Sequence, residues 1–377
     1  MSKPAKPIED LAGALESAYP ELAVVRERAT DEPAYLVGGA IRDLLLGRGR
    51  ADLDLVVEGD AATLAAKLGA QSVEHERFAT AKVRLDGHEV DIAAARTETY
   101  AQPGALPRVE PASLAEDLAR RDFTINAMAI PLRGEPRLVD PHGGRDDLEA
   151  GLLRVLHSRS FADDPTRALR AARYAARFGF DPEPETAALL READLGTVSA
   201  DRREADLLRL AAEPEAARGF ELLGEWGLVK PREGGVELAA RVAELLAAPP
   251  WSDLAARDRA VLAAALGPAG GEVELATAKP ERPSKAVELA RGHDPVELAL
   301  ARTMGAQWLD RYVAEWRSVA LEIDGEDLIA AGVPQGPALG RGLREALRRK
   351  LDGEIAGREL ELEVALKAAR GFGGGAA

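Results

Sequence analysis

The segment YLVGGAIRDLLLGRGRADLDLVVEG, residues 35–59, decides the fold. It begins with an apolar run typical of a strand, passes through the pair Gly38–Gly39 and continues as a helix. A second predicted strand, DLDLVV, carries Asp52 and Asp54 two positions apart. Successive side chains of a strand alternate between its faces, so both carboxylates point the same way. Two like charges side by side are costly without a cation between them, and the spacing therefore predicts a cation site.

The neighbouring residues suit phosphoryl transfer. Paired glycines between a strand and a helix let backbone N–H groups approach an anion, and Arg42 in the first helical turn can pair with a phosphate. Asp91, in EVDIAAAR, adds a candidate third acid on a neighbouring strand. Mg²⁺ prefers oxygen ligands and often bridges carboxylates to phosphates. Asp52 and Asp54 alone would more often be an exposed strand edge, but the combination favours a Mg²⁺ site.

Composition limits the class of protein. The 377 residues exceed one compact core, so two or more domains are expected. The absence of cysteine excludes disulfides and thiolate metal sites and fits a cytoplasmic protein. No apolar run is long enough to span a bilayer. The net charge of −15 argues against a general nucleic-acid binder, so any RNA contact must come from local patches.

The order of the predicted elements gives the organisation of the chain. Residues 8–29 have helical periodicity, and strands and helices then alternate to about residue 145. The Pro- and Gly-rich stretch 101–111 is predicted to be a loop. Strand signals nearly vanish after residue 145. The sequence therefore predicts an α+β head of about 150 residues followed by a long helical region.

Four segments together resemble the class II tRNA nucleotidyltransferase/poly(A) polymerase family in order and spacing. They are YLVGGAIRDLLLGRGRADLDLVVEG, RRDFTINAMAI, LVDPHGGRDDL and FADDPTRALRAARYAARFGF, all within residues 35–180. Two later segments, at 199–210 and 326–347, look like further family motifs, whereas 230–320 match poorly. The resemblance implies a polymerase-β-like nucleotidyltransferase head (1–150), a helical neck that recognises the nucleobase (151–228), and an elongated helical body and tail that bind tRNA (229–377).

The resemblance also implies roles for single residues. Asp52 and Asp54 would hold Mg²⁺, with Asp91 as a candidate third carboxylate. In the neck, Asp164 and Arg167 would read the base edge by hydrogen bonds, since Asp accepts and Arg donates. This chain has Asp163 where the family usually has Glu, which puts base choice in doubt. The other residues implied to bind the nucleotide, including the ribose contact Asp122, are Gly38, Gly39, Arg42, Arg121, Asp122, Arg170 and Arg173.

The most basic stretch of the C-terminal region supplies candidate RNA contacts. Arg341, Arg344 and Arg348 lie in it, followed by Arg349 and Lys350. Such a cluster can bind an RNA backbone, and it can equally be a solvated helix face. Both interpretations stay open on the sequence alone.

The function that this resemblance implies is template-independent addition of CCA to the 3′ end of tRNA from CTP and ATP. The alternatives are a CC-adding enzyme, an A-adding enzyme, a poly(A) polymerase, a non-catalytic RNA-binding scaffold, and an enzyme that nucleotidylates a small molecule or a protein. A loop of ordinary length at 101–111 favours full CCA addition. The ending GFGGGAA, in place of a basic extension, weighs against a poly(A) polymerase. No membrane association and no protein partner are implied.

Overall fold

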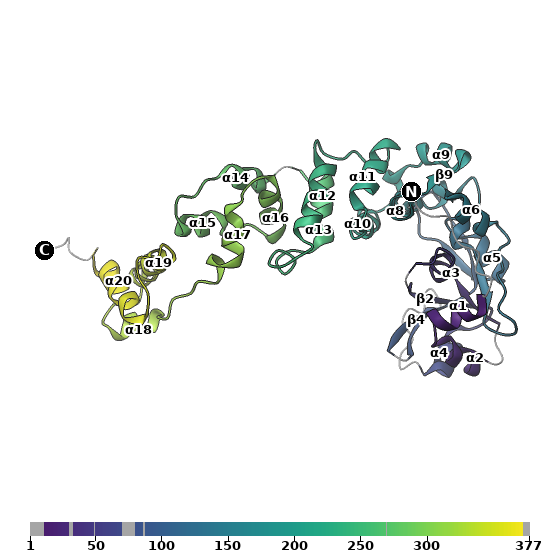
Figure 1. Cartoon of the computed structure of the whole chain (residues 1–377), viewed down its shortest axis with the longest axis horizontal. Coiled ribbons are helices and arrows are strands. Elements are labelled where there is room, and N and C mark those ends of the chain that lie inside the picture. Colours follow the sequence, from purple (N-terminus) through teal and green to yellow (C-terminus); the bar gives the residue numbers. More distant parts are fainter. Residues whose placement is uncertain are drawn as a thin grey trace. The chain divides into compact units, whose positions relative to one another are not determined.

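The computed structural model describes residues 11–29, 33–48, 50–69, 80–85, 87–268 and 270–371. The chain divides into two compact units, Met1–Lys230 and Pro231–Ala377, and Figure 1 labels their elements. The first unit contains a mixed sheet and helices, and the described part of the second is helical. The predicted α+β class with a helical region after the head is therefore confirmed.

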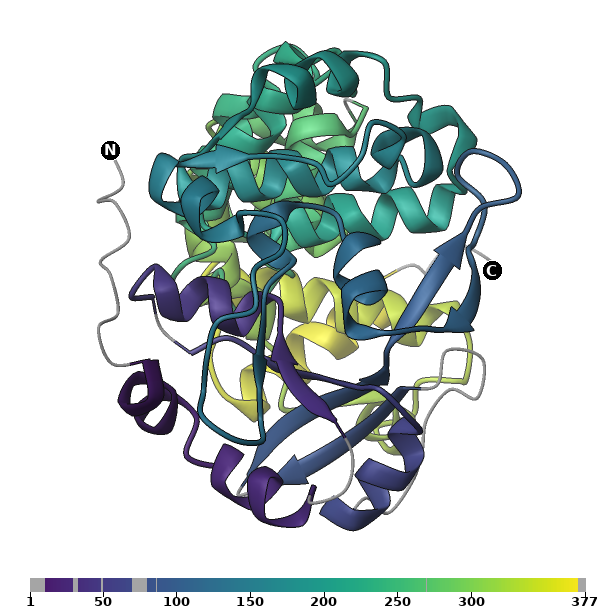
Figure 2. The ribbon, with the colours of Figure 1, turned by 90° about the vertical axis from the view of Figure 1, so that its right-hand side faces the viewer.

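A five-stranded sheet forms the base of the first unit, and its strands are purple and blue arrows in Figure 2. Its strand order is β3-β4-β2-β1-β7, and only β2 and β4 pair in parallel. The register places Asp54 of β2 beside Asp91 of β4, and Asp91 beside Lys82 of β3. The strands are β1 (Ala34–Val37), β2 (Leu53–Val57), β3 (Thr80–Leu85), β4 (His88–Ala94) and β7 (Ala129–Pro131).

The strand–glycine–helix unit forms as the sequence predicts. After β1 the chain turns at Gly38 and enters α3 (Gly39–Leu45). Gly38 has φ +70°, and a Cβ atom there would lie 3.1 Å from Nη1 of Arg121. Glycine is required at this turn because an L side chain would be strained and would crowd that guanidinium. Helix α4 (Ala61–Leu68) follows β2, capped by Asp60, whose carboxylate accepts a hydrogen bond from the amide of Ala62 at 3.0 Å.

One face of the sheet is covered by α5 (Leu114–Ala119). Its residues Leu114 and Leu118 pack in a buried cluster with Val37, Val56 and Ala129. Between β4 and α5 the chain forms a two-stranded hairpin from β5 (Arg96–Thr99) and β6 (Arg108–Pro111). The predicted loop at 101–111 is therefore shorter than expected, because its last four residues pair with β5.

The N-terminal helical prediction is wrong in one respect. The described part of 8–29 is two helices, α1 (Leu11–Ala18) and α2 (Leu22–Arg28), rather than one. The break falls at Tyr19 and Pro20, and proline removes a backbone donor and disfavours a helical conformation for the preceding residue. Tyr19 is buried at this break, and its hydroxyl accepts a hydrogen bond from the amide of Ala51 at 3.2 Å.

The rest of the first unit is mainly helical, and α8 (Thr166–Phe178) joins it to the sheet region. Tyr174 of α8 stacks on Phe178, with ring centroids 5.9 Å apart, and meets the edge of Phe123. The other elements are η1 (Thr124–Asn126), α6 (Gly144–Ala150), β8 (Leu152–Leu153), α7 (Ser160–Asp163), β9 (Asp181–Pro182), α9 (Pro184–Arg191), η2 (Leu195–Thr197), α10 (Ala200–Ala211) and α11 (Ala216–Glu225).

The second unit contains α12 (Gly235–Leu245), α13 (Arg257–Leu266), α14 (Gly271–Thr277), α15 (Pro283–Ala290), α16 (Pro295–Met304), α17 (Trp308–Ala314), η3 (Trp316–Ser318), α18 (Gly325–Ala330), α19 (Pro337–Leu351) and α20 (Arg358–Arg370). Helices α12, α13 and α16 pack together, and α18, α19 and α20 enclose a second small core around Leu328, Ala346 and Ala365. Over the described ranges, no helix has both the length and the apolar character needed to cross a membrane.

Candidate active site

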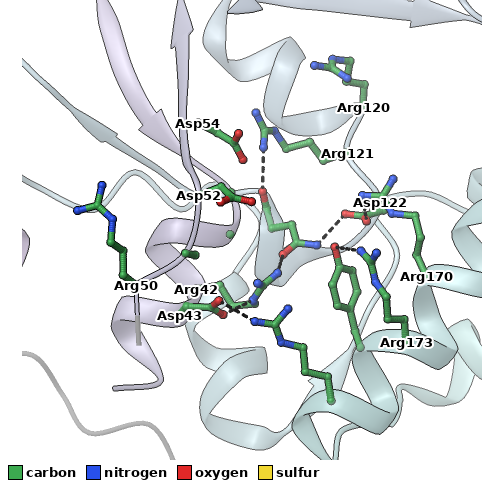
Figure 3. A pocket seen from close by; sticks show the side chains of 16 residues that line it. Arg42, Asp43, Arg50, Asp52, Asp54, Arg120, Arg121, Asp122, Arg170 and Arg173 are labelled. Atoms are coloured by element: carbon green, nitrogen blue, oxygen red, sulfur yellow. Dashed lines mark hydrogen bonds and ion pairs between the residues drawn. The ribbon is translucent and has the colours of Figure 1, made fainter. Parts of the chain in front are cut away.

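A cavity of 560 Å³ in the first unit collects most of the predicted site residues. The glycine turn, the segment before β2, the end of α5 and one face of α8 all contribute to it. In Figure 3, Asp52 and Asp54 lie on one side of the cavity and Arg170 and Arg173 on the other. Its lining is Gly38, Gly39, Arg42, Asp43, Arg50, Ala51, Asp52, Asp54, Arg120, Arg121, Asp122, Asn126, Arg170, Arg173, Tyr174 and Arg177. With seven arginines and four aspartates, the cavity is cationic although the whole chain is acidic.

The carboxylates of Asp52 and Asp54 have the properties of a cation site. Burial first, and then the neighbouring charges of Asp91 and Asp52, together raise the pKa of Asp54 to about 6 against the opposing effect of Arg121. Among the described residues, neither Asp52 nor Asp54 has a hydrogen bond or ion pair in the structure. A divalent cation would relieve this repulsion, and its preferred ligands are such oxygens.

Asp91 lies beside Asp54 in the sheet but lines a different cavity from Asp52. Lys82 forms an ion pair with Asp91 at 3.2 Å. Within the described part of the chain, no three His, Asp or Glu side chains converge closely enough to form a metal site by themselves. A cation on Asp52 and Asp54 would therefore need further oxygen ligands from a substrate.

Arg42 is held rigidly at the floor of the cavity. Its Nη1 donates to Oδ1 of Asn126 at 2.7 Å, and its Nε donates to Asp43 at 2.8 Å. The guanidinium also stacks over Phe178, 4.7 Å from the ring centroid. Because Arg42 is only 5% exposed, these contacts fix its direction. A buried, fixed guanidinium of this kind is suited to binding a phosphate group.

Asp43 is shared by two arginines from distant parts of the sequence. It accepts from Arg42 of α3 and from Arg177 of α8, the latter at 3.3 Å. Arg177 also lies 3.6 Å from Glu213. Since Asp43 is 1% exposed, its charge is compensated entirely inside the protein. This carboxylate therefore ties α8 to the glycine turn.

The RRD segment places Arg121 and Asp122 on the cavity wall. Asp117 accepts from Nη2 of Arg121 at 2.9 Å, which directs this arginine past the glycine turn. Asp122 accepts from the amide of Phe123 and from Nδ2 of Asn126, and it forms an ion pair with Arg170 at 2.6 Å. Burial would raise the pKa of Asp122, but Arg170 and Asn126 outweigh it and hold the pKa below its ordinary value.

The α8 arginines are partly buried, as their apolar neighbours suggest. Arg170 lies against Asp122, and Arg173 contacts the ring of its neighbour Tyr174, with Nη2 3.2 Å from the hydroxyl. Both line the cavity opposite the carboxylates of Asp52 and Asp54. Gly38, Gly39, Arg42, Arg121, Asp122, Arg170 and Arg173 are thus brought together around one cavity, as are Asp52 and Asp54.

Asp164 and Arg167 are absent from the lining of this cavity. Arg167 is 4% exposed and donates to Oγ of Ser160 at 2.8 Å and to the carbonyl of Arg120 at 2.7 Å. Asp164 accepts from Thr166 and from Nη2 of Arg202 at 2.9 Å. Both side chains are thus occupied by protein partners, and Arg167 contacts the backbone of Arg120, whose side chain lines the cavity.

The predicted RNA-binding residues lie in α19 of the second unit. Arg348 forms ion pairs with Glu345, Asp352 and Glu354, at 2.8, 3.2 and 3.6 Å. Arg344 has no ion pair among the described residues and lines a 250 Å³ cavity with Arg291. Arg341 lines another cavity, of 400 Å³, on the same helix. The basic cluster is therefore largely neutralised at Arg348 and more available at Arg344.

The cavity lining also includes Asp43, Arg50, Asn126 and Arg177, which are not among the predicted site residues. Asp43 and Asn126 hold Arg42, and Arg177 binds Asp43 from α8. Arg50 pairs with the buried Glu21 and donates to the carbonyl of Ala18 at 3.2 Å. The sequence offers only a weak signal for each, namely a polar residue inside or next to a predicted motif.

The first comparison defines the class of protein. Residues 34–154 match a family model described as the poly(A) polymerase head domain. This range contains the sheet, the glycine turn and the carboxylates of the cavity. The fold and the site therefore define a nucleotidyltransferase head.

Comparison with whole proteins gives the family. A CC-adding tRNA nucleotidyltransferase of Deinococcus radiodurans is 34% identical, over 91% of each chain. An A-adding tRNA nucleotidyltransferase of Geobacter sulfurreducens is 32% identical over 93% of this chain, which spans 47% of that longer relative. The solved structure of the Thermotoga maritima CCA-adding enzyme complexed with tRNA matches with a TM-score of 0.71 and 27% identity, over 94% of this chain and 98% of that one. The chain belongs to the tRNA nucleotidyltransferase/poly(A) polymerase family.

Proposed function

We propose that this protein adds nucleotides to the 3′ end of tRNA, transferring them from CTP and ATP and releasing pyrophosphate. The observation that carries the proposal is the cavity in which the carboxylates of Asp52 and Asp54, without an ion pair among the described residues, face a wall of arginines. A nucleoside triphosphate has several negative charges next to one reacting phosphorus, and both features fit this arrangement. The relatives named for the same chemistry support the choice of tRNA as acceptor.

The reaction we propose is a single displacement. The terminal 3′-hydroxyl of the RNA attacks the α-phosphorus, the bond to the bridging oxygen breaks, and pyrophosphate leaves. Asp52 and Asp54 would hold the divalent cation, most suitably Mg²⁺, which would stabilise the charge that develops on the phosphoryl oxygens. Arg42 and Arg121 bind the triphosphate, and the Gly38–Gly39 turn keeps the backbone close to it.

The nucleotide sugar and base would contact the RRD segment and α8. Asp122 is proposed to accept from the ribose 2′-hydroxyl, in competition with its ion pair to Arg170. Arg170 and Arg173 would bind the nucleotide from the opposite side. For the base edge to be read by Asp164 and Arg167, both must give up part of their hydrogen bonds to Arg202 and Ser160.

Full CCA addition is our first proposal, and CC addition is the second candidate. The Deinococcus relative, named as CC-adding, matches over nearly the whole length of both chains. The structure favours neither, because the chemistry proposed for the cavity is the same in both reactions. Since the chain spans about half the length of the Geobacter relative, activity is proposed here only for what these 377 residues contain. We place the reaction in the cytoplasm, in keeping with the cysteine-free composition.

An extension assay decides between these candidates. Three tRNA transcripts, ending at the discriminator base, after C and after CC, are incubated with Mg²⁺ and with CTP, ATP or both. Addition of C, C and A followed by a stop supports full CCA addition, and a stop after CC supports the second candidate. Long A tails would identify a poly(A) polymerase. No addition by the wild-type protein would refute the proposed function.

Asp52→Ala serves as the matched control in this assay, because it should abolish addition of every nucleotide. Its circular dichroism spectrum should be unchanged, since the side chain has no partner among the described residues. Substantial activity in this variant would contradict the role given to the carboxylate.

A further inference from the structure

A second cavity, of 320 Å³, lies beside α5 on the face of the sheet that this helix partly covers, and it has no role in the mechanism above. Its lining comes from β1, β2, β3, β4, β5 and the segment after α5. The residues are Val37, Asp54, Leu55, Val56, Thr80, Ala81, Lys82, Asp91, Ile92, Ala93, Arg96, Arg120 and Arg121. Its volume is at the small end of the range of ligand sites.

The register of the sheet builds the floor of this cavity from two rows of side chains. Across β2, β4 and β3, the first row is Asp54, Asp91 and Lys82. Two positions further along the strands, the second row is Val56, Ala93 and Thr80. Residues two apart on a strand share a face, so the charged and uncharged rows lie side by side. The small side chains of Ala93 and Thr80 leave the space that larger residues would fill.

The two cavities meet at the reacting centre. Asp54, Arg120 and Arg121 line both of them. Asp54 therefore faces the proposed triphosphate site on one side and the second cavity on the other. A displacement at the α-phosphorus needs the attacking hydroxyl next to the same carboxylate. The second cavity meets this requirement, because Asp54 forms part of its lining.

The charge of the second cavity suits a phosphodiester. Lys82, Arg96, Arg120 and Arg121 line it, against the carboxylates of Asp54 and Asp91. Arg96 is partly buried, and burial together with the neighbouring Arg120 lowers its pKa although Glu98 pairs with it at 3.2 Å. The Lys82 side chain is 58% exposed, so its ammonium group can reach an incoming anion.

We propose that this second cavity seats the 3′-terminal nucleotide of the acceptor RNA, with Lys82 contacting the phosphate that precedes the terminal ribose. The inference rests on the proposed function and assigns its acceptor site. The terminal ribose lies over Ala93 and Thr80 with its 3′-hydroxyl toward Asp54. Lys82, two strands away from Asp54, then lies on the side from which the RNA strand enters.

A simpler role for Lys82 is to neutralise Asp91, with which it pairs at 3.2 Å. That role and the proposed one predict different responses to the charge of the RNA. If Lys82 only supports Asp91, its removal impairs every acceptor equally. If Lys82 binds the phosphate, its removal matters only while that phosphate carries a charge.

The test compares two acceptors that differ at one linkage. One ends in the natural phosphodiester, and the other carries an uncharged methylphosphonate before the terminal nucleotide. For the wild-type protein the methylphosphonate should raise the acceptor KM about tenfold, the usual size for losing a hydrogen bond to a charged group. Lys82→Gln should raise the acceptor KM about tenfold for the natural RNA and cause no further rise with the methylphosphonate, while the KM for CTP stays within about twofold.

Arg84→Gln is the matched control, because Arg84 is two positions along the same strand and does not line the cavity. It removes the same charge from an exposed side chain and should leave both acceptors unaffected. Equal losses for the two RNAs in Lys82→Gln, or the same loss in Arg84→Gln, would overturn the inference while leaving the proposed function intact. An inactive wild-type protein would refute both.

Discussion

Replacing Asp54 with asparagine should stabilise the metal-free protein. The pKa of Asp54 is raised to about 6 from an ordinary value of 3.8, first by burial and then by Asp91 and Asp52. A difference of this size corresponds to about 3 kcal/mol of unfolding free energy once the group is ionised in both states. The amide that replaces the carboxylate carries no charge, so Asp54→Asn should gain up to about 3 kcal/mol at pH 7.5.

The pH dependence of this gain identifies its origin. Below pH 3.8, Asp54 is protonated in both the folded and the unfolded chain, and the substitution should change little. Between pH 3.8 and about 6 the unfolded chain loses its proton first, so the unfolding free energy of the wild type falls as the pH rises. Above that range the difference between the two proteins should stay constant. Urea unfolding in EDTA at several pH values between about 4 and 8 measures it directly.

Divalent cations should reduce the difference in unfolding free energy between the two proteins. Mg²⁺ bound to Asp52 and Asp54 would stabilise the folded wild type by mass action and would bind the Asp54→Asn variant more weakly. The two unfolding curves should therefore approach each other as the Mg²⁺ concentration rises. A variant less stable than the wild type at about pH 7.5 in EDTA, or a difference unaffected by pH, would refute this account of the carboxylate pair.

Three further substitutions test other contacts of the site and of α19. Asp43→Asn leaves Arg42 and Arg177 without their shared carboxylate and should lower the unfolding free energy by about 3 kcal/mol in urea titrations, whereas an unchanged midpoint would contradict the ion-pair assignment. Arg344→Gln should weaken tRNA binding and lower the slope of log Kd against log salt by about one. Arg348→Gln should leave the Kd and the slope unchanged, because acidic side chains already neutralise Arg348. Equal effects of the two substitutions would contradict this account of α19. Arg202→Gln removes a hydrogen bond from Asp164. In single-nucleotide extension assays, the ratio of kcat/KM for CTP to that for ATP should change by about fivefold, the size of one hydrogen bond. An unaltered ratio would show that Arg202 does not affect base choice.

The local part of the site could be predicted from the sequence, because strand alternation and turn chemistry act over a few residues. The glycine turn and the orientation of Asp52 and Asp54 both follow from such short-range patterns. Contacts between distant segments could not be predicted in this way. Arg177 meets Asp43 across 134 residues, and Arg42 meets Asn126 across 84, with no periodicity to indicate either pair.

The interpretation of α19 shows a different reason for incomplete prediction. A prediction that considers only the basic residues of α19, and not their acidic neighbours, assigns Arg348 the same RNA-binding role as Arg341 and Arg344. Glu345 and Asp352 stand three residues before and four after Arg348, which is the spacing of side-chain pairs on a helix. The helical spacing of these acids therefore distinguishes Arg348 from Arg344 in the sequence. The ion pair between Arg348 and Glu354 does not follow from this spacing and is seen only in the folded structure.

The acids of the site explain how an acidic protein can keep so many arginines ready for an anion. Buried guanidinium groups need compensating charge in the absence of substrate, and Asp43, Asp117 and Asp122 supply it. These same acids compete with the substrate for the arginines that they position. Asp43 is buried and shared by two arginines, so it acts as a permanent support. Asp122 instead faces the cavity through its ion pair with Arg170, and a nucleotide that reaches this pair must exchange one partner for another.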